Sequence, residues 1–279
     1  MKDKKRIRSL ISLTLSFFLT ISIIGIYISV ELQLGYLNKD NIRTSIISSG
    51  YTTKAQAKFQ DEVMDILSEY NISKDIGGEI ADENAVYIAV SNYTDGVLSG
   101  SNSKNENYQN EIEEIVTNYF TENNIFITDG MKLNITEIAT EITGLYKQYI
   151  TPNFISILFD QIKEYRSLIT IYQIVSIGLF FGISIVLFWI WRHKHRAMRC
   201  IAMSLITSVA VNALITFFIW KSDVIRQLNV GPDFYLDFLL EYKNNGIVHW
   251  YIVTGIGLVL CIVSLAAVKF LKYNKSKSS

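Results

Sequence analysis

Residues 167–191 read SLITIYQIVSIGLFFGISIVLFWIW, an uncharged run of 25 residues that lies between Arg166 and Arg192. A bilayer core about 30 Å thick is crossed by roughly 20 residues of helix, because each residue rises about 1.5 Å. Three more runs reach that length without Asp, Glu, Lys or Arg, namely residues 9–30, 200–220 and 247–268. The chain is therefore predicted to contain four transmembrane helices.

The first apolar run follows a basic segment, residues 1–8, and so has two interpretations. A secretory signal peptide has an apolar region of only about 7–15 residues and ends at a small-residue cleavage site. Residues 9–30 are longer and continue into Glu31-Leu32-Gln33-Leu34 without such a site. We therefore expect an uncleaved membrane anchor.

The basic residues that flank the runs predict the orientation of the chain. Residues 1–8, the loop 192–199 and the tail 269–279 together hold 13 Lys or Arg residues and one acid, Asp3. The remaining residues hold 13 basic and 25 acidic side chains. Because basic loops beside span ends stay in the cytoplasm, both termini are predicted to be cytoplasmic, in the plasma membrane of a bacterium. The loop 192–199 supplies four of these topogenic residues: Arg192, Lys194, Arg196 and Arg199.

All four tryptophans lie at predicted span ends, where the amphipathic indole ring is favoured. We expect them to be interface anchors: Trp189, Trp191, Trp220 and Trp250.

The segment between the first two spans, residues 31–166, is predicted to be an extracytoplasmic acidic domain, because it carries 21 acidic and 10 basic residues. It has no cysteine and so folds without disulfides. Its apolar residues recur at helical spacing in three sets and predict a mainly α-helical domain. These sets begin at Phe59, Ile112 and Ile135. A shorter loop, residues 221–246, is predicted on the same side of the membrane.

Two short segments of that domain are ambiguous between helix and strand. Residues 85–90, AVYIAV, are rich in β-branched residues, but Asp82 and Glu83 before them suit the start of a helix, which we favour. Residues 125–128, IFIT, are interpreted as a loop or a strand. Residues 97–107 are expected to form a flexible loop.

Small and polar residues inside the spans predict contacts between helices. Gly178 and Gly182 form a GxxxG pair, which brings helices close together either within the bundle or in a homodimer. An amide in hydrocarbon needs a partner, so Asn212 is predicted to bond to a neighbouring helix. The full predicted set of helix-packing residues is Gly178, Gly182, Asn212, Gly255 and Gly257.

The sequence carries no catalytic signature such as a P-loop, an H-E-x-x-H motif or a nucleophile elbow. Asp61, Asp65 and Glu69 share one helix face, which is most often a solvated acidic face. Proton relays and ion-coupled transporters usually place charged residues inside spans, and the four runs hold none. We expect no enzyme activity, no catalytic residue, no metal, no cofactor and no binding of nucleic acid.

Two resemblances add to this interpretation. The stretch YLNKDNIRTSIISSGYTTKAQAKFQDEVMDIL, residues 36–67, and the layout of the whole chain resemble uncharacterised four-span membrane proteins of low-GC Gram-positive bacteria. That resemblance implies no activity and no site residue. The order of spans and outer loops also resembles FtsX/MacB-type permeases, which would imply an ABC ATPase as partner.

The expected function is that of a non-enzymatic membrane protein that binds or senses an envelope protein or peptide through residues 31–166, as an accessory or scaffold subunit. The alternative is a permease-like subunit of an ABC-type machine. Both hypotheses require a lipid bilayer around the four spans.

Overall fold

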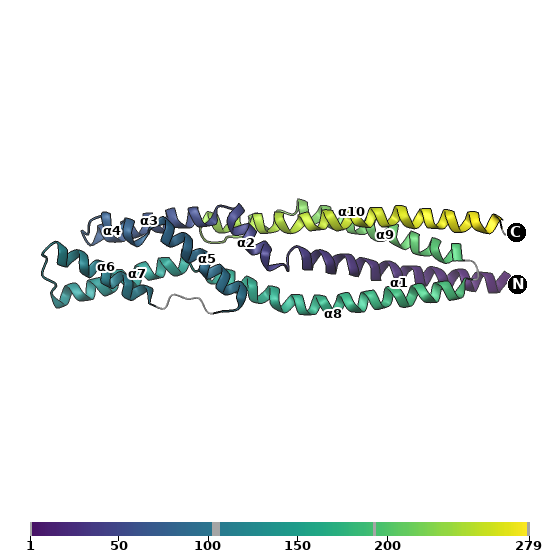
Figure 1. The fold of residues 1–279 in the computed structure, drawn as a ribbon, viewed down its shortest axis with the longest axis horizontal. Helices are drawn as coiled ribbons and strands as arrows, with labels where there is room; N and C mark the ends of the chain where they lie inside the picture. The colour runs from purple at the N-terminus through teal and green to yellow at the C-terminus, as the bar shows by residue number, and fades with distance from the viewer. Residues whose placement is uncertain (1, 102–106, 192–193, 278–279) are drawn as a thin grey trace. The chain divides into compact units, whose positions relative to one another are not determined.

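The computed structural model describes residues 2–101, 107–191 and 194–277, with side chains for residues 6–101, 107–191 and 194–273. Within these ranges every regular element is a helix and no strand occurs (Figure 1). The elements are α1 (Lys2–Leu34), α2 (Lys39–Ser48), α3 (Tyr51–Glu69), α4 (Asp75–Ile80), α5 (Glu83–Ser99), α6 (Tyr108–Glu122), α7 (Asp129–Tyr149), α8 (Asn153–Ile190), α9 (Lys194–Lys221), the short 3-10 helix η1 (Ile225–Gln227) and α10 (Asp233–Lys277).

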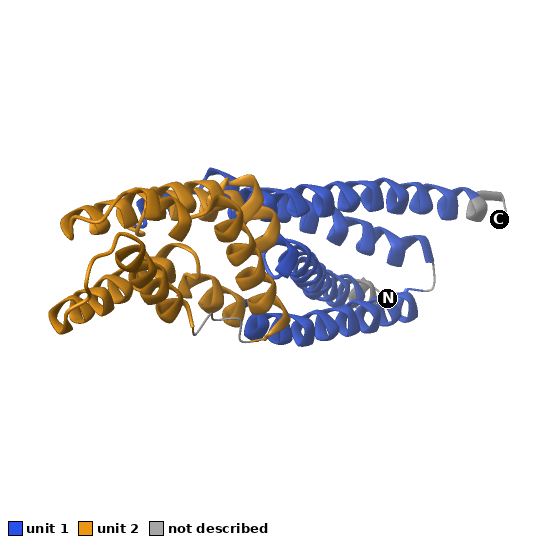
Figure 2. Cartoon of the chain, turned by 60° about the vertical axis from the view of Figure 1, so that its left-hand side comes forward, with its two compact units in different colours: residues 1–41, 162–228, 242–279 blue, residues 42–161, 229–241 orange. Residues whose placement is uncertain are grey.

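The described residues form two compact units that each combine distant parts of the chain (Figure 2). Unit 1 comprises residues 1–41, 162–228 and 242–279, and unit 2 comprises residues 42–161 and 229–241. The four helices that are long and apolar enough to cross a membrane are α1, α8, α9 and α10. The four predicted runs lie in these helices, one in each, and the run 167–191 extends one residue past the end of α8.

Unit 1 is held together by apolar packing and by hydroxyl groups that bond to the backbone of a neighbouring helix. Its core includes Leu19, Ile23 and Leu187. Across helices, the Ser22 hydroxyl donates to the Ser176 carbonyl at 2.6 Å, and the Ser204 hydroxyl donates to the Ser16 carbonyl at 2.9 Å. Hydroxyl bonds of this kind are a common way for helices to associate in lipid.

Unit 2 has a core built from helices with one apolar face. In α3 every fourth residue is buried, which places five side chains on one face because a helix has 3.6 residues per turn. These residues are Tyr51, Ala55, Phe59, Val63 and Leu67. The predicted face that begins at Ile135 is also buried, in α7. The face that begins at Ile112 is buried only at Ile112 and Val116 of α6. The helical periodicity of this region is therefore confirmed.

The two ambiguous segments are resolved. Residues 85–90 lie in α5, which begins after Asp82, whose carboxylate accepts a bond from the Ala85 amide at 2.8 Å. The helical interpretation is therefore confirmed. Residues 125–128 belong to the connection between α6 and α7 and form no ladder, because no described strand offers them a partner.

The predicted loop 221–246 is only partly correct. Residues 233–246 are helical, because α10 begins at Asp233 and continues into the fourth apolar run. The helix begins before the apolar run because Phe234 and Phe238 are buried in unit 2. Their packing stabilises helical turns that the local sequence did not lead us to predict. The predicted flexible loop 97–107 begins later than expected, since α5 extends to Ser99; residues 102–106 lie outside the described residues.

Candidate functional site

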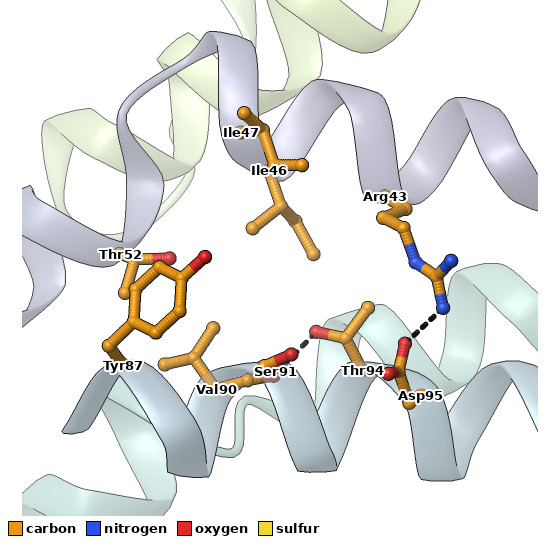
Figure 3. Close-up of a pocket in the computed structure, with 9 residues that line it drawn as sticks. All are labelled: Arg43, Ile46, Ile47, Thr52, Tyr87, Val90, Ser91, Thr94 and Asp95. Carbon is orange, nitrogen blue, oxygen red and sulfur yellow. Dashed lines mark hydrogen bonds and ion pairs between the residues drawn. The ribbon is translucent and has the colours of Figure 1, made fainter. Parts of the chain in front are cut away.

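A small pocket lies in unit 2 among α2, α3 and α5 (Figure 3). The helical spacing of α5 places Tyr87, Ser91 and Asp95 on one face at intervals of four residues, which is why one side of the pocket is continuous. The pocket has a volume of about 90 Å³. Its lining residues are Arg43, Ile46, Ile47, Thr52, Tyr87, Val90, Ser91, Thr94 and Asp95.

The rim of this pocket is unusually apolar for a surface in an acidic unit. Ile47 is 72% exposed and Tyr87 is 62% exposed, and the neighbouring Ile88 is also exposed. Tyr87 faces Ile46 and Ile47 across the opening in Figure 3. Exposed apolar groups that gather at one concave place are typical of a binding surface.

An ion pair lies at one end of the pocket, where the Arg43 guanidinium donates to the Asp95 carboxylate. Both side chains are about half exposed, so the pair contributes at most about 1 kcal/mol to folding. For binding, the pair matters because it presents a hydrogen-bond donor and an acceptor beside the apolar pocket.

Three aliphatic hydroxyl groups line the pocket, and no histidine is among its lining residues. The described histidines, His195 and His249, belong to unit 1. Thr94 donates its hydroxyl proton to the Val90 carbonyl within its own helix at 2.7 Å. The Thr94 hydroxyl is therefore already engaged within α5.

Tyrosine hydroxyls fix the turn between α7 and α8 in the same unit. Tyr51 from α3 donates to the Tyr149 carbonyl at 2.9 Å, and Tyr93 from α5 donates to the Pro152 carbonyl at 2.8 Å. Tyr235 from α10 donates to the Gln148 carbonyl. The last carbonyls of a helix have no partner within the helix, so Tyr235 and Tyr51 satisfy the Gln148 and Tyr149 carbonyls at the end of α7. The Pro152 carbonyl accepts a second bond, from the Ile155 amide at 3.2 Å. We call Tyr51, Tyr93 and Tyr235 the tyrosine cluster.

Burial affects the acidity of this cluster. It raises the pKa of Tyr51 well above its usual value, and it also raises the pKa of Tyr93. Both phenols therefore stay protonated, and stay hydrogen-bond donors, over the physiological pH range.

Unit 1 contains a polar group that the sequence interpretation missed. Glu31 is completely buried, and its carboxylate accepts a bond from the amide of Asn212, which also donates to the Thr254 hydroxyl at 3.0 Å. We placed Glu31 outside the membrane because the uncharged run ends at Val30. The missed signal is its spacing, since Leu19, Ile23 and Tyr27 precede it at intervals of four and are all buried.

The structure distributes the predicted helix-packing residues unequally. Asn212 forms the interhelical bond that its position predicts. Gly257 is closely packed, because a Cβ atom there would lie 2.7 Å from the Tyr27 hydroxyl. A Cβ atom at Gly178, Gly182 or Gly255 would meet nothing within 4 Å. These three glycines therefore do not mediate contacts within this chain, contrary to the bundle-contact interpretation, because their helix faces are turned outward.

The predicted interface anchors are also unequal. Trp189 and Trp220 are exposed. Trp191 is half-buried, donates to the Ser12 hydroxyl at 3.1 Å and lies under the Arg196 guanidinium. Trp250 is only 3% exposed and packs near Tyr36, so its ring is covered by the packing of unit 1.

Three of the four predicted topogenic residues are described, and Lys194, Arg196 and Arg199 are all exposed. Arg192 lies outside the described residues. No group of three or more His, Cys, Asp or Glu side chains in the described part of the chain could hold a metal ion.

The chain matches no protein-family model, no curated protein and no solved structure.

Proposed function

We propose that this chain is a multi-pass membrane protein that binds an envelope protein through unit 2, without catalysing a reaction. The observation that carries the membrane part is the exposure of apolar side chains along the long helices. Only 11% of the most apolar window of α8 is buried within the chain, and Phe181 and Ile185 are among its exposed residues. A continuous surface of this kind is stable in lipid and costly in water.

The orientation that we propose follows from charge. The exposed Lys194, Arg196 and Arg199 lie where α8 ends and α9 begins, and basic residues at that position favour the cytoplasmic side. Unit 2 then lies outside the cytoplasm, because it is joined to the opposite ends of α1 and α8. In this arrangement the plasma membrane of a bacterium surrounds unit 1.

The size of the pocket in unit 2 favours a protein partner over a small molecule. A volume of about 90 Å³ equals roughly three waters at about 30 Å³ each. Drug-sized ligands and cofactors occupy pockets of about 300–1,000 Å³. The pocket is therefore suited to one apolar side chain from a partner, with Arg43 and Asp95 bonding to the backbone beside it.

Charge further defines the partner. Residues 31–166 carry about twice as many acidic as basic side chains. Complementary charge speeds encounter and suppresses wrong partners, so the partner surface is basic around its apolar anchor. We propose an extracytoplasmic protein or peptide with that pattern.

The membrane placement is tested with a reporter enzyme inserted after Gly100, between α5 and α6. The reporter should be active outside the cytoplasm and inactive inside it, and the full chain should require detergent for extraction. A reporter that is active only in the cytoplasm, or a chain recovered in the soluble fraction, contradicts the placement.

The binding proposal is tested in cells with a photo-crosslinking phenylalanine analogue at Tyr87. The matched control carries the analogue at Phe126, which is 86% exposed but lies in the connection between α6 and α7. We expect one discrete adduct from position 87, of a mass that differs from a second copy of this chain, and its loss in Ile47→Asp. Equal adducts from both positions, an adduct of two copies, or no adduct would refute it.

A further inference from the structure

Three helices of unit 1 bring polar atoms together at one buried place. The residues are Glu31 and Tyr27 from α1, Asn212 from α9 and Thr254 from α10. Glu31 and Asn212 are each 0% exposed, and Tyr27 is 7% exposed. Tyr27 lies one turn before Glu31, beside Gly257, which is one turn after Thr254. We call these four residues the buried polar site.

The carboxylate of this site has no cationic neighbour. No described Lys, Arg or His forms an ion pair with Glu31. The titratable groups that face the site from the packed helices are Tyr27 and Cys261, and neither can carry a positive charge. A buried carboxylate without a compensating charge is very costly, so such groups are paired, neutralised or bound to a cation.

The site also has more oxygen atoms than hydrogen-bond partners. The Tyr27 hydroxyl oxygen, the second carboxylate oxygen of Glu31 and the side-chain carbonyl oxygen of Asn212 are all buried without a partner. Buried polar atoms are rarely left unpaired in this way, and each such group calls for an explanation. Here the three unpaired atoms belong to neighbouring residues, and all three are oxygens that can coordinate a cation.

We propose that the buried polar site binds one monovalent cation, either a proton or an alkali-metal ion, at Glu31. Carboxylate, amide and hydroxyl oxygens are hard ligands that suit cations without a preference for nitrogen or sulfur. The only formal charge in the ligand set is the single negative charge of Glu31. One monovalent cation makes the site neutral, whereas a divalent ion would leave a buried positive charge.

Occupancy of this site affects how unit 1 holds together. Glu31 lies near the end of α1, and its bond to Asn212 joins α1 to α9, while the Asn212–Thr254 bond joins α9 to α10. Loss of the cation leaves a buried negative charge among these three helices, which favours their separation. The cation therefore stabilises the contact of α1 with α9 and α10.

The proposal is tested on the purified full chain in detergent by thermal unfolding, followed by tryptophan fluorescence. All four tryptophans belong to unit 1, so this signal reports on the correct part of the chain. Sodium chloride replaces choline chloride at constant ionic strength, at pH 5.5 and at pH 8. A bound cation should raise the midpoint by about 5 °C per hundredfold increase in its concentration above the dissociation constant.

Two positive results distinguish the two cations. A sodium-dependent midpoint at pH 8 that becomes independent of sodium at pH 5.5 identifies an alkali-metal ion that competes with a proton. A midpoint that falls from pH 5.5 to pH 8 and ignores sodium identifies a proton. Either response should be lost in Glu31→Gln and kept in the matched control Asp223→Asn, which changes an exposed acid of unit 1.

The proposal fails if the wild type responds to neither cation, or if Glu31→Gln responds as the wild type does. If Glu31→Gln does not fold, the proposal is tested on the wild-type protein alone, by labelling with a hydrophobic carbodiimide. This reagent reacts with protonated buried carboxyl groups. Mass spectrometry should locate the label on Glu31, with less label at high pH or in sodium. Absence of label on Glu31 under all conditions overturns the proposal. These results do not depend on membrane orientation, which the reporter after Gly100 tests separately.

Discussion

The tyrosine cluster gives the sharpest test of the structure of unit 2, through the single change Tyr51→Phe. The Tyr51 ring is fully buried and lies 5.2 Å from the Phe234 ring and 6.3 Å from the Phe238 ring, centroid to centroid. The change keeps these ring contacts and removes only the hydroxyl that donates to the Tyr149 carbonyl at 2.9 Å. The same hydroxyl also has a side-chain hydrogen bond with Tyr235, so any loss of stability comes from the hydrogen bonds of this one hydroxyl.

The expected magnitude follows from what the carbonyl loses. A net hydrogen bond contributes about 0.5–1.5 kcal/mol, and a buried acceptor left unpaired costs about 1–3 kcal/mol. The Tyr149 carbonyl belongs to the last residue of α7, where no helical amide can replace the hydroxyl. We expect a loss of about 1.5 kcal/mol, which is roughly a tenfold rise in the opening equilibrium of this turn.

Hydrogen–deuterium exchange of the full chain in detergent measures this effect locally. The reporting amides are those of Ile150 and Thr151, which both donate to the Tyr146 carbonyl at the end of α7. They should exchange about tenfold faster in Tyr51→Phe. The matched control is Tyr87→Phe, which removes a hydroxyl from a ring that is 62% exposed and should leave these rates unchanged. Rates within twofold of wild type in Tyr51→Phe, or equal acceleration in both variants, would refute the reasoning.

Three further predictions concern pH, close packing and a helix start. Because the folded-state pKa of Tyr51 is raised, its contribution to stability is complete below the unfolded-state pKa of about 10 and is lost as pH rises from that value through the folded-state pKa. Tyrosinate absorbance should therefore show alkaline unfolding of unit 2, and the loss of stability with rising pH should be less steep in Tyr51→Phe. Gly35→Ala puts a Cβ atom 2.6 Å from the Gly246 carbonyl oxygen and should destabilise unit 1 by about 1–3 kcal/mol, measured by tryptophan fluorescence, whereas Gly178→Ala should be neutral or stabilising. Asp82→Ala removes the cap of α5 and should cost about 1 kcal/mol in urea unfolding followed by circular dichroism, an effect absent from an exposed mid-helix change such as Asp61→Ala.

Periodicity predicted the helical fold well, because the patterns that define α3, α6 and α7 are local. For a residue such as Phe59 or Ile138, apolar neighbours three and four positions away in the sequence identify the buried face of its helix. The four long apolar helices were equally easy to predict from the sequence, since the free-energy cost of exposing about 20 apolar residues to water does not depend on the rest of the fold.

The candidate sites were less predictable, because they depend on residues that meet across long separations. Glu31 and Asn212 are 181 residues apart, and no local pattern pairs them. The burial of Phe238 in unit 2 was missed for the same reason. The pocket beside Arg43 and Asp95 needs the packing of α2 against α5, whereas the sequence shows only that each helix exists.

The last described part of unit 2, residues 229–241, is made late during translation. Its Phe234 and Phe238 complete the aromatic core around Tyr51, yet the ribosome must first synthesise residues 162–228. At about 5–20 residues per second this takes several seconds, during which the nascent unit exposes an unfinished aromatic face. Chains truncated before residue 229 should therefore be recognised by chaperones and proteases, so that surveillance of unit 2 also monitors the synthesis of residues 162–228 of unit 1.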